Sequence, residues 1–392
     1  MARAALLSRR FLGCRPCMRA AAAATRTFAT ASDPQRASAN SNARVKLVEV
    51  GPRDGLQNEK KAIPLATKLE LIERLAKTGL TTIEAGSFVS PKWVPQMDNS
   101  SEILQHLLQH PPASPRPLTF SFLAPNLKGL NNAFTVLAQH PDSFATESTT
   151  TTSSTSSPSS SPASPPKPAL EVAVFAAATE TFSRKNLNCD IATSLARFRE
   201  VIQAAKETHS LRVRAYISVV LGCPFEGFDV DGHRVAEIAT ALLEMGADEI
   251  ALGDTTGMGT APRTKELLNC LSAAGVRNED IAMHFHDTYG QALVNTAVAL
   301  EHGIRTFDCS VGGLGGCPYS PGATGNVATE DMVYFMETLG MDTGVDLDAV
   351  VDVGDWITRE IGKGNASAVG PAVLGARKRA EAEREQAKAE EA

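Results

Sequence analysis

Residues 281–287 read Ile-Ala-Met-His-Phe-His-Asp, an apolar run that ends in two histidines and an acid. The run has the length and composition of a short buried β-strand. Side chains two positions apart in a strand point to the same face, so His284 and His286 can reach one point in space. Two neutral imidazoles, joined by oxygen ligands from elsewhere, would bind a divalent metal. For a His-x-His pair alone a hydrogen-bonded core histidine is the commoner explanation, so the neighbouring strands decide between the two.

Seven other segments share this pattern of a short, β-branched apolar run that leads into polar residues. They are residues 45–50, 82–86, 118–123, 170–177, 213–220, 249–253 and 306–311. Amphipathic stretches separate them, as in residues 65–78, where Leu65, Leu69 and Ile72 share one helical face. A glycine follows the last periodic residue of several such stretches, as a helix C-cap does: Gly79, Gly246, Gly275 and Gly303.

Alternating strands and helices of this kind predict an α/β fold, and eight repeats match a (β/α)8 TIM barrel with a C-terminal helical extension. A doubly wound open sheet is the alternative. It is less well supported, because no G-x-G-x-x-G motif follows the first strand.

Composition excludes several classes of protein. The 392 residues are 43% hydrophobic, which is enough for one large domain or two ordinary ones. The formal net charge of -6 argues against a nucleic-acid partner, and no apolar run reaches the length of about 18 residues that a membrane span needs. Seven scattered cysteines do not form a disulfide framework.

The first 40 residues are rich in Arg, Ala and Ser, and no acid precedes Asp33. This composition predicts a cleaved mitochondrial presequence and a location in the mitochondrial matrix. Cys14 and Cys17 form a C-x-x-C in this segment, which is weak evidence for a metal or redox site because no second pair follows.

We expect the barrel domain to span residues 41–370, followed by a charged tail at residues 371–392. Residues 143–168 are almost entirely Ser, Thr, Pro and Ala, a composition that predicts a disordered insertion. The insertion falls between the third helix and the fourth strand, so we expect it on the face of the barrel opposite the catalytic loops.

The active site of such a barrel lies at the carboxyl ends of the strands. Candidate groups at these ends are Arg53, Asp54, Gln57 and Lys60 after the first strand, Glu84 on the second, Asp254 after the sixth, His284, His286 and Asp287 on the seventh, and Cys317 and Asn326 after the eighth. Each has an ordinary structural explanation, such as a surface ion pair or a helix cap. Their joint occurrence on one rim favours a functional site.

Asp54, His284, His286 and Asn326 would offer a metal two oxygens and two nitrogens, with water and substrate completing the coordination. This mixture favours Mg²⁺ or Mn²⁺ over a structural zinc site, although imidazole also suits zinc.

Several strings at these strand ends closely resemble the 3-hydroxy-3-methylglutaryl-CoA lyase family. They are VEVGPRDGLQNE, IEAGSFVSPKWVPQM, FSRKNLN, LGCPFEG, LGDTTGMG, HFHDTYGQALVNT and GLGGCPYSPGATGNVATED. The resemblance covers residues 45–340 apart from the insertion, and the first-strand motif with the Gly-Gly-Cys-Pro loop separates lyases from condensing relatives.

The resemblance implies a metal-dependent cleavage of 3-hydroxy-3-methylglutaryl-CoA to acetyl-CoA and acetoacetate, as in leucine breakdown and ketone-body formation. It implies metal ligation by the four residues above, and catalytic roles for Arg53, Glu84 and Cys317. Asp54 and His284 remain alternative candidates for the base. We expect the acyl-CoA substrate to contact Arg53, Gln57, Lys60 and Asp254, and the protein to form a homodimer.

One stretch departs from the family, whose Asn-Arg-Lys run near the end of the barrel is replaced here by Gly362-Lys363-Gly364-Asn365. Four alternatives are weighed against this resemblance. An acyl-CoA condensing enzyme, like homocitrate or isopropylmalate synthase, would usually carry further C-terminal domains. A lyase for a longer branched 3-hydroxyacyl-CoA would use the same residues. A metal hydrolase would commonly carry its His-x-His on the first strand, and a non-enzymatic binding barrel would not need Arg53, Asp54 and Cys317 together.

Overall fold

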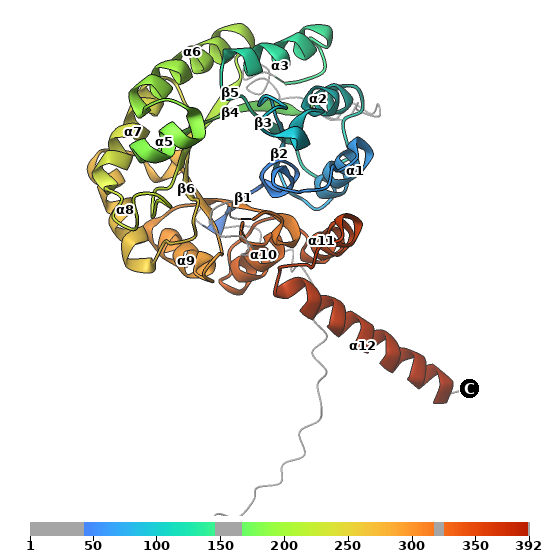
Figure 1. The fold of residues 1–392 in the computed structure, drawn as a ribbon. Helices are drawn as coiled ribbons and strands as arrows, with labels where there is room; N and C mark the ends of the chain where they lie inside the picture. The colour runs from blue at the N-terminus through green and yellow to red at the C-terminus, as the bar shows by residue number, and fades with distance from the viewer. Residues whose placement is uncertain (1–42, 146–166, 317–324, 391–392) are drawn as a thin grey trace, which may run out of the picture. The chain divides into compact units, whose positions relative to one another are not determined.

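The computed structural model describes residues 43–145, 167–316 and 325–390, so the expected presequence, most of the insertion and Cys317 lie outside the described residues. Eight parallel strands form a closed barrel in which each strand pairs with the next in sequence and β8 returns to β1 (Figure 1). The strands are β1 (Lys46–Glu49), β2 (Thr82–Ser87), β3 (Thr119–Leu123), β4 (Ala169–Ala177), β5 (Arg212–Ser218), β6 (Glu249–Asp254), β7 (Ile281–Phe285) and β8 (Thr306–Cys309). All eight expected strands are confirmed, and the doubly wound sheet is excluded.

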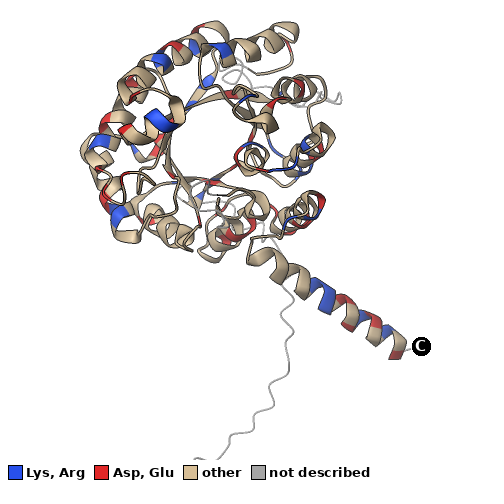
Figure 2. Ribbon diagram, viewed as in Figure 1, with Lys and Arg blue, Asp and Glu red and all other residues tan. Residues whose placement is uncertain are grey.

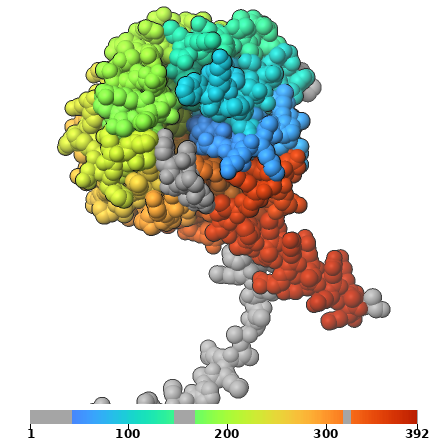
Figure 3. Space-filling view, in the orientation of Figure 1, coloured from blue at the N-terminus to red at the C-terminus, as the bar shows by residue number. Residues whose placement is uncertain are grey.

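Helices surround the barrel, and in the space-filling view they and the loops hide most of the strands (Figure 3). They are α1 (Leu65–Ala76), α2 (Ser100–Gln109), α3 (Leu127–Gln139), α5 (Glu180–Leu187), α6 (Ile191–His209), α7 (Gly232–Glu244), α8 (Ala261–Ala273), α9 (Ala292–His302), α10 (Thr329–Thr338), α11 (Leu347–Ile361) and α12 (Val369–Glu390). Gly303 closes α9 in the left-handed conformation at φ 106°, as expected of a C-cap glycine.

Strand alternation divides the core into two layers. On β5, Val213, Ala215 and Ile217 are fully buried in the large core formed with the helices. The interleaved positions belong to the barrel interior, where a small apolar cluster contains Leu123, Ala173, Tyr216, Ala251 and Ala282. The outer layer therefore supplies most of the hydrophobic stabilisation, and the interior is left with room for polar side chains.

Charged residues of both signs are spread over the outer helices (Figure 2). A second set is buried at inward-facing strand positions, which are hydrophobic in most barrels of this type. It comprises Glu84, Glu171, Arg214, Glu249 and Asp308, of which none is more than 4% exposed. A buried charge is tolerated only when it is paired, so these residues must contact one another or the site above them.

The described flanks of the Ser/Thr/Pro insertion meet at the amino end of β4, where the Ala145 amide donates a 2.9 Å hydrogen bond to the Pro168 carbonyl. This end is opposite the carboxyl ends of the strands.

At the carboxyl terminus, Arg377 of α12 forms ion pairs with Asp348 and Asp352 on α11. Among the described residues, no helix has the length and apolar character that a membrane crossing requires.

Candidate active site

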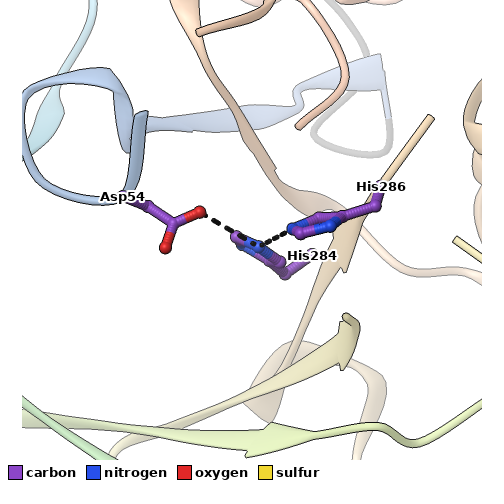
Figure 4. Close-up of side chains that lie close together, drawn as sticks. All are labelled: Asp54, His284 and His286. Atoms are coloured by element: carbon purple, nitrogen blue, oxygen red, sulfur yellow. Dashed lines mark hydrogen bonds and ion pairs between the residues drawn. The ribbon is translucent and has the colours of Figure 1, made fainter. Parts of the chain in front are cut away.

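A tight turn after β1 carries Asp54 over the mouth of the barrel. The turn, η2 (Gly51–Gly55), is π-helical, and the amides of Arg53, Asp54 and Gly55 all donate to the Val50 carbonyl. Pro52 suits the start of this turn because its missing N–H is not needed there. Figure 4 shows Asp54 pointing from this segment toward His284 and His286.

The three side chains form a compact donor cluster. The Nε2 atoms of His284 and His286 are 3.2 Å apart, and His284 Nε2 lies 3.9 Å from Asp54 Oδ2. Asn326 joins them because its backbone pairs with His286 and its amide nitrogen donates a 2.8 Å hydrogen bond to Asp54 Oδ2. The four expected metal ligands are therefore brought together from the turn after β1, the end of β7 with the residue that follows it, and the segment after β8.

The geometry of the cluster fits a divalent cation. Two ligands held at right angles about 2.1 Å from one ion lie about 3.0 Å apart, close to the separation of the two imidazole nitrogens. One potential ligand atom each from Asp54, His284 and His286 lies within 4.8 Å of the others. Asn326 would have to offer its amide oxygen, since its amide nitrogen donates to Asp54 and to the Leu314 carbonyl.

The surroundings of Asp54 and His286 favour the forms of these two residues that bind a metal at neutral pH. Burial would raise the pKa of Asp54, but Arg53 and the two imidazoles outweigh it and lower that pKa to about 2. Burial, together with the neighbouring His284, lowers the pKa of His286 to about 4. Asp54 is thus a carboxylate and His286 a neutral imidazole, which are the forms that bind metals.

Arg53 links this cluster to the second strand. Its guanidinium donates from Nη1 to Asp54 Oδ1 and from Nη2 to Glu84 Oε2, both at 2.6 Å. The Tyr216 hydroxyl donates to the same Glu84 oxygen at 3.0 Å. Arg53 Nε is buried and has no hydrogen-bond partner among the described residues, so at least this N–H donor is left beside the donor cluster.

Residues inside the barrel, on β8 and β5, also connect to the cluster. His284 is in register with Asp308 on β8, and its Nδ1 lies 2.9 Å from Asp308 Oδ2. Arg214 on β5 donates from Nη2 to Asp308 Oδ1 at 2.5 Å. The sequence reasoning missed Asp308, Arg214 and Tyr216, and the available signal was a charged or hydroxyl-bearing residue inside an otherwise apolar strand.

The remaining candidate residues divide into those near the cluster and those outside it. Gln57 donates a 2.9 Å hydrogen bond to Asp54 Oδ1. Asp254 ends β6 beside β7, and burial raises its pKa to about 7 despite the hydrogen bond from the Gly259 amide. Lys60 is exposed and takes part in none of these hydrogen bonds. Cys317 lies outside the described residues.

Two buried glutamates fix the loops that carry the site. Glu49 on β1 accepts from the Gly51 amide at 2.8 Å and from the Val311 amide at 2.9 Å, so it joins the loop after β1 to the loop after β8. Glu330 on α10 accepts from the Gly312 amide through both carboxyl oxygens, at 3.0 and 2.9 Å. The sequence reasoning missed both, because Glu49 ends β1 but faces away from the site, and Glu330 lies on a helix.

Comparison with known proteins agrees with this geometry. The family model described as HMGL-like matches residues 44–357. The 3-hydroxy-3-isohexenylglutaryl-CoA/hydroxymethylglutaryl-CoA lyase of Pseudomonas aeruginosa is 49% identical over 84% of this chain and 97% of its own length. The mitochondrial hydroxymethylglutaryl-CoA lyase of Gallus gallus is 45% identical over 84% and 97%. The cytoplasmic 3-hydroxy-3-methylglutaryl-CoA lyase of Mus musculus is 42% identical over 85% and 86%.

Solved structures give the same result. The crystal structure of a hydroxymethylglutaryl-CoA lyase from Pseudomonas aeruginosa superposes with a TM-score of 0.73 at 47% identity, covering 85% of this chain and 98% of that one. An HMG-CoA lyase from Acinetobacter baumannii, solved with coenzyme A and 3-methylmalate, gives 0.71 at 31% identity over 85% and 96%. The relatives include both mitochondrial and cytoplasmic proteins, so similarity alone does not fix the compartment.

Proposed function

The chain belongs to the HMGL-like family, and we propose that it cleaves 3-hydroxy-3-methylglutaryl-CoA to acetyl-CoA and acetoacetate. One observation carries the proposal. Arg53 lies against Asp54 and the two histidines, so a fixed positive charge and a set of metal donors adjoin in one buried site. A retro-Claisen cleavage needs both, because it deprotonates a hydroxyl and forms an enolate on a thioester.

The reaction removes the proton of the substrate's tertiary hydroxyl, breaks the bond between C2 and C3, and returns a proton to C2. The bound cation would polarise the hydroxyl and carboxylate oxygens of the substrate and hold them in place. Asp54 and His284 are the two proposed acceptors of the hydroxyl proton, and Asp54 is favoured where both ring nitrogens of His284 are engaged, Nδ1 by Asp308 and Nε2 by the cation. The electron pair of the broken bond becomes the enolate of acetyl-CoA.

Arg53 would stabilise the negative charge that develops on the thioester oxygen. Glu84 and Asp54 each accept one N–H from its terminal nitrogens, and the buried Nε–H, which has no partner among the described residues, remains available to substrate. Arginine suits this role because it stays charged and its donors have a fixed geometry. We propose Gln57, Lys60 and Asp254 as substrate contacts, and Cys317 as a residue that delivers or relays the proton to the enolate.

The carboxylate and amide oxygens, completed by water and substrate oxygens, support Mg²⁺ or Mn²⁺ as the cofactor, and no thiolate of the described residues joins the donor cluster. We propose a location in the mitochondrial matrix, on the ground of the arginine-rich amino-terminal segment. The homodimer stays a separate proposal that follows from the family resemblance. A longer branched 3-hydroxyacyl-CoA is a second candidate substrate, because the Pseudomonas aeruginosa relative is named for one such compound.

Acetoacetate release by the purified protein tests the proposal. Protein stripped with a chelator should be inactive, and added Mg²⁺ or Mn²⁺ should restore acetoacetate and acetyl-CoA in equal amounts. No acetoacetate with either metal would overturn the proposed reaction.

A further inference from the structure

Asp308 is the buried carboxylate that touches both a site histidine and an interior arginine. Its side chain is 1% exposed, that of Arg214 is 0% exposed, and that of His284 is 9% exposed. One oxygen of Asp308 accepts from Arg214 Nη2, and the other lies 2.9 Å from His284 Nδ1. The strand register makes this contact direct, because His284 and Asp308 are paired residues on adjacent strands.

The contact dictates which imidazole nitrogen carries the proton in the neutral ring. An ionised carboxylate can only accept hydrogen bonds, so Nδ1 of His284 must donate to Asp308. Nε2 is then left with a lone pair, and it is the nitrogen that lies 3.2 Å from His286 Nε2 and 3.9 Å from Asp54 Oδ2. Asp308 therefore directs the ligating lone pair of His284 into the donor cluster.

Arg214 offsets the cost of burying the negative charge of Asp308. A carboxylate buried without a cation would be costly, and Arg214 supplies the charge through a short hydrogen bond. Arg214 has a second carboxylate neighbour, Glu249, whose Oε1 lies 3.2 Å from Arg214 Nε. Glu249 also approaches Lys46, and it has no hydrogen bond or ion pair with a histidine of the described residues. It therefore shares the charge environment of Asp308 without its link to the site.

We propose that Asp308 is a positioning residue for the metal ligand His284, held in its ionised form by Arg214. The inference rests on the proposed function only in assuming that the cluster binds a divalent cation. Partners of this kind typically change metal affinity by 10- to 100-fold, roughly, when they are removed.

Binding of Mn²⁺ alone to the metal-free full-length protein, followed by electron paramagnetic resonance of the free ion, tests the proposal without substrate. Asp308→Asn keeps the shape of the side chain but no longer enforces a donor at Nδ1, so its Mn²⁺ affinity should fall at least about tenfold. Glu249→Gln is the matched control, and its affinity should stay within about twofold of the parent. An Asp308→Asn affinity within twofold of the parent, or an equal loss in Glu249→Gln, would overturn the proposal.

A second measurement decides the question if Asp308→Asn does not fold. Nitrogen-15 NMR of histidine-labelled, metal-free parent protein reports which ring nitrogen is protonated, and the His284 signal is assigned by its loss in His284→Gln. The spectrum is recorded at a pH high enough for the ring to be neutral. A proton on Nδ1 then supports the proposal, and a proton on Nε2 contradicts it. Neither readout needs acetoacetate formation, so a failure of the proposed reaction would leave this result standing and would be recognised separately.

Discussion

Arg53 and Glu84 form a buried ion pair in which Nη2 and Oε2 are 2.6 Å apart and the two side chains are 8% and 1% exposed. The pair joins the turn after β1 to the second strand and fixes the guanidinium next to Asp54. Breaking such a pair from one side leaves an uncompensated charge, which is strongly destabilising. Arg53 is therefore held rigidly in place before substrate arrives, which is the condition for electrostatic catalysis.

Arg53→Gln should lower kcat by about 100-fold or more, because it removes the charge proposed to stabilise the enolate oxygen. Steady-state kinetics with saturating metal checks the rate, and Mn²⁺ titration checks that the cation still binds. Near-normal kcat would remove Arg53 from the mechanism.

Tyr216→Phe removes only the hydroxyl that donates to Glu84 Oε2. The loss of one hydrogen bond in this network should cost about 1 kcal/mol of stability and reduce kcat several-fold, with KM little changed. Thermal unfolding and kinetics measure the two effects. Tyr334→Phe, at an exposed tyrosine on α10, is the matched control and should change neither the stability nor kcat. A Tyr216→Phe enzyme with the stability and kcat of the parent would mean that Glu84 does not depend on this contact.

His286→Ala should abolish the stabilisation that Mn²⁺ gives to the parent. A ligand that binds the folded state alone raises the free energy of unfolding with the logarithm of its concentration once that concentration exceeds Kd, so the parent's unfolding midpoint should rise by a few degrees at high Mn²⁺. His233→Ala, at an exposed histidine on α7, should keep the full gain. If His286→Ala retains the Mn²⁺ shift, the cation binds elsewhere.

Glu330→Gln should change how stability depends on pH. Burial raises the pKa of Glu330 from 4.5 to about 8, so the folded state favours the protonated carboxyl. That contribution is complete below pH 4.5 and is lost as the pH rises through about 8. Unfolding midpoints at several pH values should therefore fall less steeply toward alkaline pH in Glu330→Gln than in the parent.

Exposed Glu301→Gln serves as the control for that series and should follow the parent. A Glu330→Gln variant that loses stability with pH just as the parent does would show that this carboxyl is already ionised throughout the range.

Deletion of residues 146–166 should leave kcat within about twofold of the parent. The flanks already meet through the hydrogen bond between Ala145 and Pro168, and a shortened loop there needs no rearrangement of the strands. A folded deletion variant without activity would contradict the placement of the insertion away from the site.

The barrel was predictable because strands and helices recur with a regular pattern that local hydrophobicity records. The metal cluster was also predictable, since His284 and His286 share a strand face and Asp54 follows another strand at the same rim. The roles of Asp308 and Arg214 were not. Their contacts depend on the register between strands, and a one-residue shift of β8 would turn Asp308 away from the interior.

The contacts of Glu49, which joins two loops of the site, could not be predicted from the sequence either. Glu49 lies on the opposite face of β1 from the site, and its value to the site comes from two backbone amides far apart in the sequence, those of Gly51 and Val311. A backbone amide has no residue signature, so no pattern in the sequence could have identified the partners of this carboxylate.

A product assay across a panel of acyl-CoA compounds tests the central claim most directly. The metal-loaded protein should convert 3-hydroxy-3-methylglutaryl-CoA to equal amounts of acetyl-CoA and acetoacetate, with the highest kcat/KM in the panel, and should not condense acetyl-CoA with 2-oxo acids. Higher kcat/KM for a longer branched 3-hydroxyacyl-CoA would reassign the substrate. Condensation without cleavage, or no product from any compound, would contradict the account.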